Sequence, residues 1–177
     1  RQTAAAAARF GLACEVILEE RTGSNAVDYN GSGKVLLDRL LGASIRNVPG
    51  GTDMNAELEK SAQAARERGG KPYVIPGGGS NTIGALGYVD CALELVRQAD
   101  AENLTIDRIV TATGSAGTHA GLVAGLALLG ADIPVLGIGV RAPKDVQEAN
   151  VHKLAVETAT LLGHGERVTR EMTVANC

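Results

Sequence analysis

The chain of 177 residues is 45% hydrophobic and carries a net charge of −3, with a pI near 5.6. This length and composition allow a buried core for one domain or for parts of two. Lys and Arg are scattered among acidic residues, which argues against a nucleic-acid partner. The longest apolar runs are too short and too rich in glycine to span a bilayer, so we expect no membrane association and a cytoplasmic location.

The sequence predicts alternating helices and strands from its hydrophobic period and from the positions of glycine and proline. The expected order is helix 1–10, strand 14–18, helix 34–42, strand 44–48, helix 54–70, strand 73–76, helix 82–100, strand 108–113, helix 117–129, strand 135–140 and helix 145–162. Asp53 is expected to be the N-cap of the third helix. Short apolar strands separated by helices predict an α/β fold of open, mostly parallel sheets with helices on both faces.

A change of composition near residue 77 predicts two domains. Before it the helices are charged and amphipathic, whereas the sequence after it is rich in Gly, Ala and Leu and is expected to be more deeply buried. We therefore assign 1–77 and 78–177 to different domains.

Both ends of the sequence have the pattern of interrupted elements. The alanine-rich stretch RQTAAAAARFG starts at Arg1 without a helix cap. At the other end, VTREMTVANC stops where an extended segment has begun at 172–175. We expect the chain to be an internal piece of a longer protein, truncated at both termini.

The chain offers few candidate metal ligands, because its cysteines and histidines have no spacing typical of a metal site. The residues concerned are Cys14, Cys91, Cys177, His119, His152 and His164. We therefore expect no bound metal.

Two glycine-rich loops are the candidate ligand-binding segments. In open parallel sheets, ligands bind beyond the carboxyl ends of the strands, where loops lead into helices. PGGGSN (76–81) and TGSAGTHAG (113–121) both occupy that position in the predicted order, so we expect them to share a cleft. In the first loop, Ser80 and Asn81 are possible donors to a flat ligand, and the alternative is a tight glycine turn.

The segment from Gly114 to Thr118 is suited to an anion. A helix N-terminus presents unpaired N–H groups and a partial positive charge, glycine lets an anion approach the backbone, and two hydroxyls add donors. A phosphate is the natural occupant, while a glycine-rich turn for tight helix packing explains the same residues equally well. The spacing is not Gly-x-Gly-x-x-Gly, which disfavours a dinucleotide. His119 is expected to be a neutral capping or packing residue and not a catalytic base.

Three stretches carry a resemblance to a known family: RQTAAAAA (1–8), PYVIPGGGSNTIGALGYVDCALEL (72–95) and TATGSAGTHAGL (111–122). In this order and spacing they resemble the pyridoxal-phosphate enzymes of the tryptophan-synthase-β-like fold, fold type II. The branch they resemble contains D-cysteine desulfhydrase, 1-aminocyclopropane-1-carboxylate (ACC) deaminase and L-cysteate sulfo-lyase. Within it, NAVDYNGSGKVLLDRLLGA (25–43), IPVLGIGVRAPKDVQEANV (133–151) and the terminal VAN are most similar to L-cysteate sulfo-lyase.

The resemblance implies that 1–77 is most of the smaller domain of the family and that 78–177 is part of the larger, phosphate-binding domain. It also implies pyridoxal 5′-phosphate as cofactor and assigns roles to both loops. Its phosphate is expected at one segment, made of Thr113, Gly114, Ser115, Ala116, Gly117 and Thr118. The substrate or cofactor face is expected at Gly78, Gly79, Ser80, Asn81 and Arg141. The Schiff-base lysine of the family stands in an Asn-Lys-x-Arg-Lys context that no lysine of this chain has. It is expected upstream of Arg1, so that the chain holds no catalytic residue and is inactive alone.

The activity implied is elimination of the β-substituent of a small amino acid, which for L-cysteate gives pyruvate, ammonia and sulfite. A sulfonate needs cationic or N–H donors, for which Arg141 and Lys144 are candidates, although RAPK also fits a solvated turn. The alternatives are D-cysteine desulfhydrase, which releases sulfide, then ACC deaminase, and a non-catalytic phosphate-binding module built on the same fold. The family also implies a homodimer.

Overall fold

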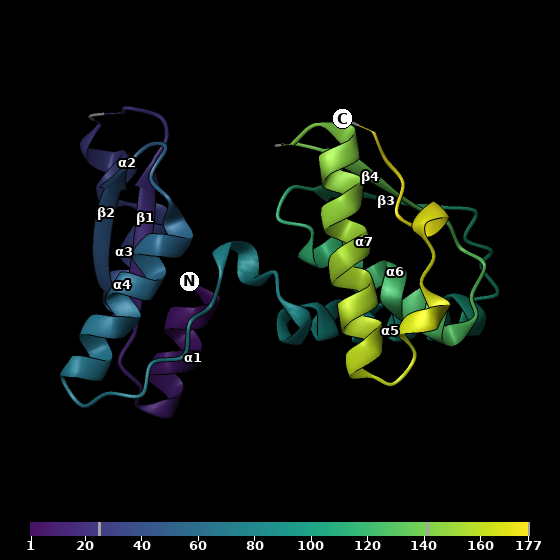
Figure 1. Cartoon of the computed structure of the whole chain (residues 1–177), viewed down its shortest axis with the longest axis horizontal. Coiled ribbons are helices and arrows are strands. Elements are labelled where there is room, and N and C mark those ends of the chain that lie inside the picture. The colour runs from purple at the N-terminus through teal and green to yellow at the C-terminus, as the bar shows by residue number, and fades with distance from the viewer. Residues whose placement is uncertain (25, 141, 177) are drawn as a thin grey trace. The chain divides into compact units, whose positions relative to one another are not determined.

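The computed structural model describes residues 1–24, 26–140 and 142–176. The chain divides into two compact units, Arg1–Val74 and Ile75–Cys177 (Figure 1). The division lies close to the change of composition at residue 77. That the units correspond to the smaller and larger domains of the resembled family stays a prediction.

The first unit is a small parallel sheet with helices. Its elements are α1 (Gln2–Phe10), β1 (Glu15–Glu20), α2 (Val27–Gly31), α3 (Gly33–Leu40), β2 (Ser44–Pro49) and α4 (Met54–Glu67). β1 and β2 pair in parallel from Glu15 opposite Ser44 to Glu20 opposite Pro49. The predicted cap of α4 is confirmed, because Asp53 Oδ1 accepts hydrogen bonds from the amides of Asn55 at 3.0 Å and Ala56 at 3.1 Å.

The second unit contains a three-stranded parallel sheet, in the order β3-β4-β5, and three long helices. Its elements are η1 (Gly77–Gly79), α5 (Thr82–Ala101), β3 (Ile109–Thr113), α6 (Gly117–Leu129), β4 (Val135–Gly139), α7 (Lys144–Leu161), η2 (Gly165–Arg167), η3 (Arg170–Met172) and β5 (Ala175–Asn176). The α/β class predicted from the sequence is confirmed.

Two predicted segments differ from the structure. Residues 73–76, expected to be a strand, are extended but have no strand partner in the described chain. Pro72 precedes them and Pro76 is the last of them, and both prolines lack the N–H that a sheet ladder needs. PGGGSN therefore does not follow a strand, contrary to expectation. In addition, the short helix α2 forms inside a segment expected to be a polar loop, with Asp28 in its first turn.

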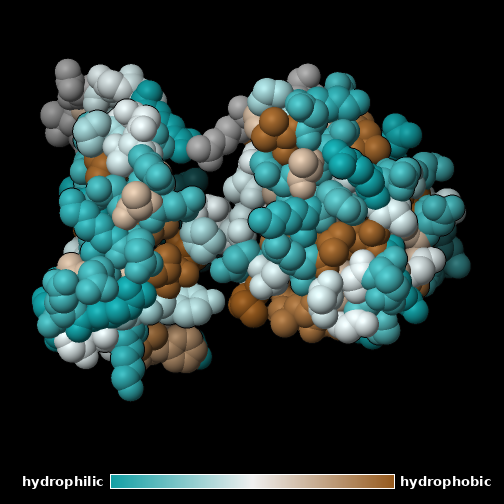
Figure 2. Space-filling model, viewed as in Figure 1, coloured by the Kyte–Doolittle hydropathy of each residue, from teal (hydrophilic) through white to brown (hydrophobic). Residues whose placement is uncertain are grey.

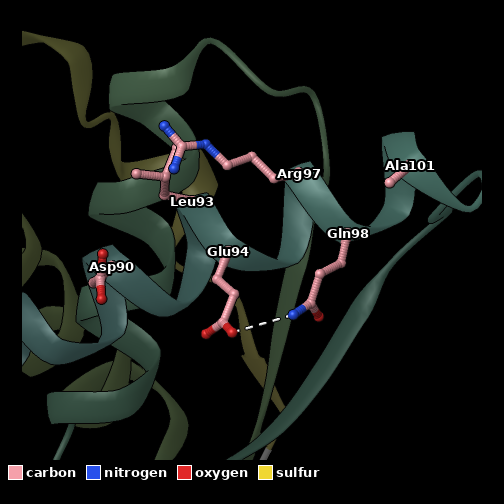
Figure 3. Close-up of a pocket in the computed structure, with 6 residues that line it drawn as sticks. All are labelled: Asp90, Leu93, Glu94, Arg97, Gln98 and Ala101. Carbon is pink, nitrogen blue, oxygen red and sulfur yellow. Dashed lines mark hydrogen bonds between the residues drawn. The ribbon is translucent and has the colours of Figure 1, made fainter.

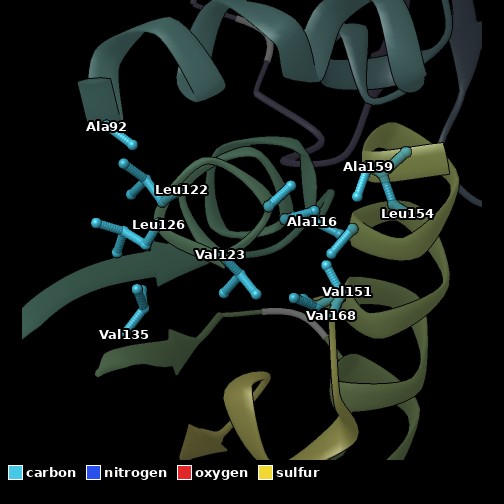
Figure 4. Close-up of a cluster of buried hydrophobic side chains, with 13 residues drawn as sticks. Ala92, Ala116, Leu122, Val123, Leu126, Val135, Val151, Leu154, Ala159 and Val168 are labelled. Carbon is cyan, nitrogen blue, oxygen red and sulfur yellow. The ribbon is translucent and has the colours of Figure 1, made fainter. Parts of the chain in front are cut away.

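Helix α6 is the centre of the second unit. Nine of its residues are buried, and its apolar side chains pack with α5, α7 and β4 in one cluster (Figure 4). Gly121 and Gly125 let α5 come close, because a Cβ at Gly121 would lie 2.5 Å from the Ala85 carbonyl oxygen and one at Gly125 2.7 Å from Ala92 Cβ. A helix buried on several sides explains why α6 shows no polar face in the sequence.

The surface is mixed in character. In the view of Figure 2, hydrophilic side chains cover most of the visible surface, and apolar patches interrupt them on both units. Exposed apolar side chains include Phe10 and Leu40 in the first unit, and Val110 and Val140 in the second. Among the described residues, no helix is long and apolar enough to cross a membrane.

Candidate functional site

The loop between β3 and α6 places a helix N-terminus at the carboxyl end of a strand. β3 ends at Thr113 and α6 begins at Gly117, so only three residues connect them. Ala116 caps the helix with φ 73° and ψ −24°, a left-handed conformation that costs a residue with a Cβ about 1–2 kcal/mol. Such backbone strain is typical of binding sites, where the surrounding structure maintains it.

The first turn of α6 provides backbone donors for an anion. The helix itself leaves its first N–H groups unpaired, and it carries no acidic side chain in this turn. Within the turn, the Gly117 amide donates to Ser80 Oγ at 3.1 Å, and the first helical bond to Ala116 comes from the Ala120 amide. The amides of Thr118 and His119 lie between these two and face no helical acceptor, which makes them the candidate anion ligands.

The two glycine-rich loops lie against each other, as expected from the sequence. Ser80 Oγ lies 2.9 Å from Ser115 Oγ, across 35 positions of sequence. Gly78 and Gly79 have φ values of 73° and 64°, which glycine adopts without strain. This turn brings Ser80 to the start of α6, so the second unit by itself assembles both loops.

Close contacts between the loops require two of their glycines. A Cβ at Gly78 would overlap the Ser115 side chain, and a Cβ at Gly117 would lie 2.7 Å from Ser80 Oγ. Each loop therefore contributes a serine that rests on a glycine of the other loop. This reciprocal contact explains the small side chains in both segments.

Asn81 and Thr113 were predicted as site residues, but their side chains make structural hydrogen bonds. Asn81 Oδ1 accepts from the Gly84 amide at 2.8 Å and caps α5. Thr113 is buried, and its Oγ1 accepts from Gln147 Nε2 of α7 at 2.7 Å. The hydroxyl of Thr113 is therefore directed into the core, and it anchors the start of the loop between β3 and α6. Gln147 was not singled out in the sequence, because nothing in a helical run predicts which polar residue is buried.

His119 is fully buried beneath the loop. Both of its ring nitrogens lack a hydrogen-bond partner among the described residues, and a Cβ at Gly137 of β4 would lie 2.6 Å from its Nδ1. Burial lowers the pKa of His119, because it disfavours the charged imidazolium. The Val135 backbone carbonyl and the Glu148 carboxylate oppose this only in part. His119 is thus a buried packing residue, as expected from the sequence, and burial is the main cause of the lowered pKa.

The sequence also predicted two cationic site residues after β4. Arg141 lies outside the described residues. Lys144 is exposed at the start of α7, and its Nζ lies 3.9 Å from Glu148 Oε1. Among the described residues, the candidate site therefore consists of the two glycine-rich loops.

A shallow hollow runs along the surface of α5 and is distinct from these loops (Figure 3). It is lined by Asp90, Leu93, Glu94, Arg97, Gln98 and Ala101, which all belong to this one helix. Gln98 Nε2 donates to Glu94 Oε1 at 3.1 Å, as expected for neighbours on a helix surface. Side chains of a single helix face do not converge on a ligand, so we do not consider this hollow an active site.

The fold and the loops together define a class: an α/β unit in which a helix N-terminus suited to an anion follows a parallel strand. The family model described as "Pyridoxal-phosphate dependent enzyme" matches residues 1–175. The chain belongs to this family, whose members use pyridoxal phosphate.

Curated relatives narrow the comparison. The chain is 42% identical to proteins named D-cysteine desulfhydrase from Yersinia pestis (strain Pestoides F) and from Yersinia enterocolitica serotype O:8. Each match extends over 92% of this chain and 49% of the relative. The chain thus spans about half the length of these relatives.

Solved structures support the fold. The crystal structure of an ACC deaminase homologue superposes with a TM-score of 0.73 at 36% identity, over 90% of this chain and 46% of that chain. The structure of O-ureido-L-serine synthase gives a TM-score of 0.56 at 19% identity, over 76% of this chain and 39% of that one, and indicates a shared fold alone.

The loops fit the phosphate of the cofactor. Ala116 is held in a strained conformation, glycines allow the two loops to pack closely, and the hydroxyls of Ser80 and Ser115 lie beside the N-terminus of α6. Donors of this kind suit a phosphate dianion.

Proposed function

We propose that a protein containing this chain is a pyridoxal-phosphate-dependent carbon–sulfur lyase, and that the chain provides its phosphate site. The observation that supports the proposal best is the pairing of two glycine-rich loops at the N-terminus of α6, joined by Ser80 and Ser115. It occurs in a chain that is 42% identical to D-cysteine desulfhydrases.

In this proposal, Ser115, Ala116, Gly117 and Thr118 form the phosphate site. The amides at the start of α6 and the hydroxyls of Ser115 and Thr118 donate to phosphate oxygens, and the helix dipole adds a favourable field. Thr113 and Gly114 lead the strand into this site. When bound, the cofactor supplies the electron-withdrawing ring that carbon–sulfur elimination needs, and these residues bind and orient it.

D-Cysteine is the substrate that we propose first, since curated relatives of that activity match 92% of the chain. The products would be pyruvate, ammonia and sulfide. The sequence patterns favoured L-cysteate, which remains the second candidate because of the segment RAPK after β4. The contact between Lys144 and Glu148 weakens this candidate, as it already compensates part of the positive charge that a sulfonate would need.

The phosphate site can be tested on the 177-residue chain by titration with inorganic phosphate and pyridoxal phosphate. Thr118→Glu places a carboxylate in the first turn of α6, where the dipole stabilises it but where it repels the anion. We expect at least about tenfold weaker phosphate binding with an unchanged melting temperature. Thr118→Gln is the matched neutral control: it removes the same hydroxyl without adding a charge, so it should lose clearly less affinity than Thr118→Glu. Equal binding by Thr118→Glu and wild type would contradict the site.

The substrate can be decided with the complete gene product that contains this chain. Supplied with pyridoxal phosphate, it should release sulfide from D-cysteine. Sulfite from L-cysteate, with no sulfide from D-cysteine, would reverse the order of the two candidates. A purified holoenzyme that is inactive on both would overturn the lyase proposal.

A further inference from the structure

The Ser80 hydroxyl occupies a position that the phosphate site, as proposed above, does not explain. It is half-buried between the two loops and makes two hydrogen bonds, one to a backbone amide of α6 and one to a side chain of the phosphate loop. Both partners belong to the segment that we propose to hold phosphate, whereas Ser80 itself belongs to the other loop. Ser80 is therefore in a position to control the donors of the site without contacting the anion.

In these two hydrogen bonds, Ser80 accepts from α6 and donates to the other loop. The Gly117 amide can only donate, so Ser80 Oγ accepts from it at 3.1 Å. Ser80 has one hydroxyl hydrogen, which it donates to Ser115 Oγ at 2.9 Å. An acceptor position of Ser115 is thereby filled, and its own hydroxyl hydrogen remains to be donated elsewhere. Ser115 is exposed, so that hydrogen can reach a ligand from solvent.

We propose that Ser80 is a positioning residue which forms a hydrogen-bond relay from the Gly117 amide through Ser80 to Ser115, and which makes Ser115 a donor to the bound phosphate. The proposal rests on the phosphate site proposed above. Hydrogen bonds in such a chain polarise one another, so the Ser115 hydroxyl becomes a better donor than an isolated one. The relay is already formed without a bound anion, so less conformational entropy is lost when the anion binds.

The glycine contacts indicate that this arrangement is specific. Gly78 leaves space for Ser115, and Gly117 leaves space for Ser80, whose Cα lies 3.3 Å from the position of a Cβ at Gly117. A larger residue at either glycine would separate the two hydroxyls. The same packing holds Ser80 in place, so the relay does not depend on the hydrogen bonds alone.

The relay is tested by phosphate binding to four forms of the 177-residue chain: wild type, Ser80→Ala, Ser115→Ala and the double variant. Ser80→Ala should weaken binding of inorganic phosphate by about threefold to tenfold. If Ser80 acts through Ser115, the double variant should bind no more weakly than Ser115→Ala alone. Ser61→Ala, which removes a serine hydroxyl bonded to Glu15 Oε2 in the first unit, is the matched control and should bind as wild type.

Two further variants separate hydrogen bonding from packing. Ser80→Cys keeps the size but is a weak donor, so it should behave like Ser80→Ala. Ser80→Thr keeps the hydroxyl and should restore most of the binding. Amide exchange at Gly117, measured without ligand, should be faster in Ser80→Ala than in wild type, which reports the first bond of the relay independently of phosphate.

The outcomes that overturn the relay differ from those that overturn the phosphate site. Phosphate binding by wild type together with full binding by Ser80→Ala, or tighter binding because Ser80 competes for the Gly117 amide, would overturn the relay alone. Strictly additive effects of the two alanine substitutions would do the same. Failure of the wild-type chain to bind either phosphate or pyridoxal phosphate would overturn the site and the relay with it.

Discussion

At the scale of single residues, the hydrogen bond between Thr113 and Gln147 holds the start of the loop between β3 and α6 inside the core. Gln147→Leu should lower the free energy of unfolding by about 1–3 kcal/mol, because it leaves the buried Thr113 hydroxyl without its partner. Replacing Thr113 by Val as well should recover part of this loss, since both polar groups are then gone. Urea denaturation of the two single variants and the double variant measures the recovery, and purely additive losses would contradict it.

His119 gives the stability of the second unit a dependence on pH. Its pKa in the folded chain is lowered below the usual 6.5, so the unfolded chain binds the proton more readily. Stability is therefore complete above pH 6.5 and falls as the pH drops below that value. In His119→Gln, the fall in unfolding free energy between pH 7.5 and about 5.5 should be smaller than in wild type. Identical slopes in the two proteins would show that His119 does not contribute.

At the scale of elements, the contact between α5 and α6 depends on missing side chains. Gly121→Ala should destabilise the chain by about 1–3 kcal/mol through overpacking, since its Cβ would lie 2.5 Å from both the Ala85 carbonyl oxygen and Tyr88 Cβ. Helix propensity favours alanine by about 1 kcal/mol and is not enough to offset this.

Gly87 of α5 is the matched control for this contact. No atom lies within 4 Å of the position of its Cβ, so Gly87→Ala should stabilise the chain by about 0.5–1 kcal/mol. Thermal unfolding of the two variants should give shifts of opposite sign. Shifts of the same sign would contradict the packing of α6 against α5.

At the scale of the whole molecule, the segment between α4 and η1 connects two compact units. Tyr73 lies in this segment, outside every helix and strand, and is 71% exposed. Brief digestion of the native chain with chymotrypsin should cut after Tyr73 and release fragments of residues 1–73 and 74–177. Tyr29, inside α2, should be cut much more slowly. A first cut within β3, α6 or α7 would contradict the division into units.

The sequence determined the local structure wherever a short-range cause operates. Helix 117–129 was predicted with the observed bounds, because glycines stand at both of its ends and a continuous apolar run lies between them. Asp53 as a cap was likewise readable from neighbouring residues. Residues 73–76 were predicted wrongly, since an apolar run becomes a strand only where a partner strand is present, and sequence pattern does not reveal the partner.

The candidate site shows the same distinction. The glycines and hydroxyls of TGSAGTHAG fitted an anion site, because unpaired amides follow from any helix start, and fitted a tight glycine turn equally well. The resemblance to a phosphate-binding family favoured the anion site. Only the tertiary structure decided that Ser80 lies on Gly117, that Gln147 anchors Thr113 and that His119 is buried without a partner. These contacts join residues 34 to 37 positions apart or set the burial of a single side chain. They depend on how α5, α6 and α7 pack, which local sequence does not encode.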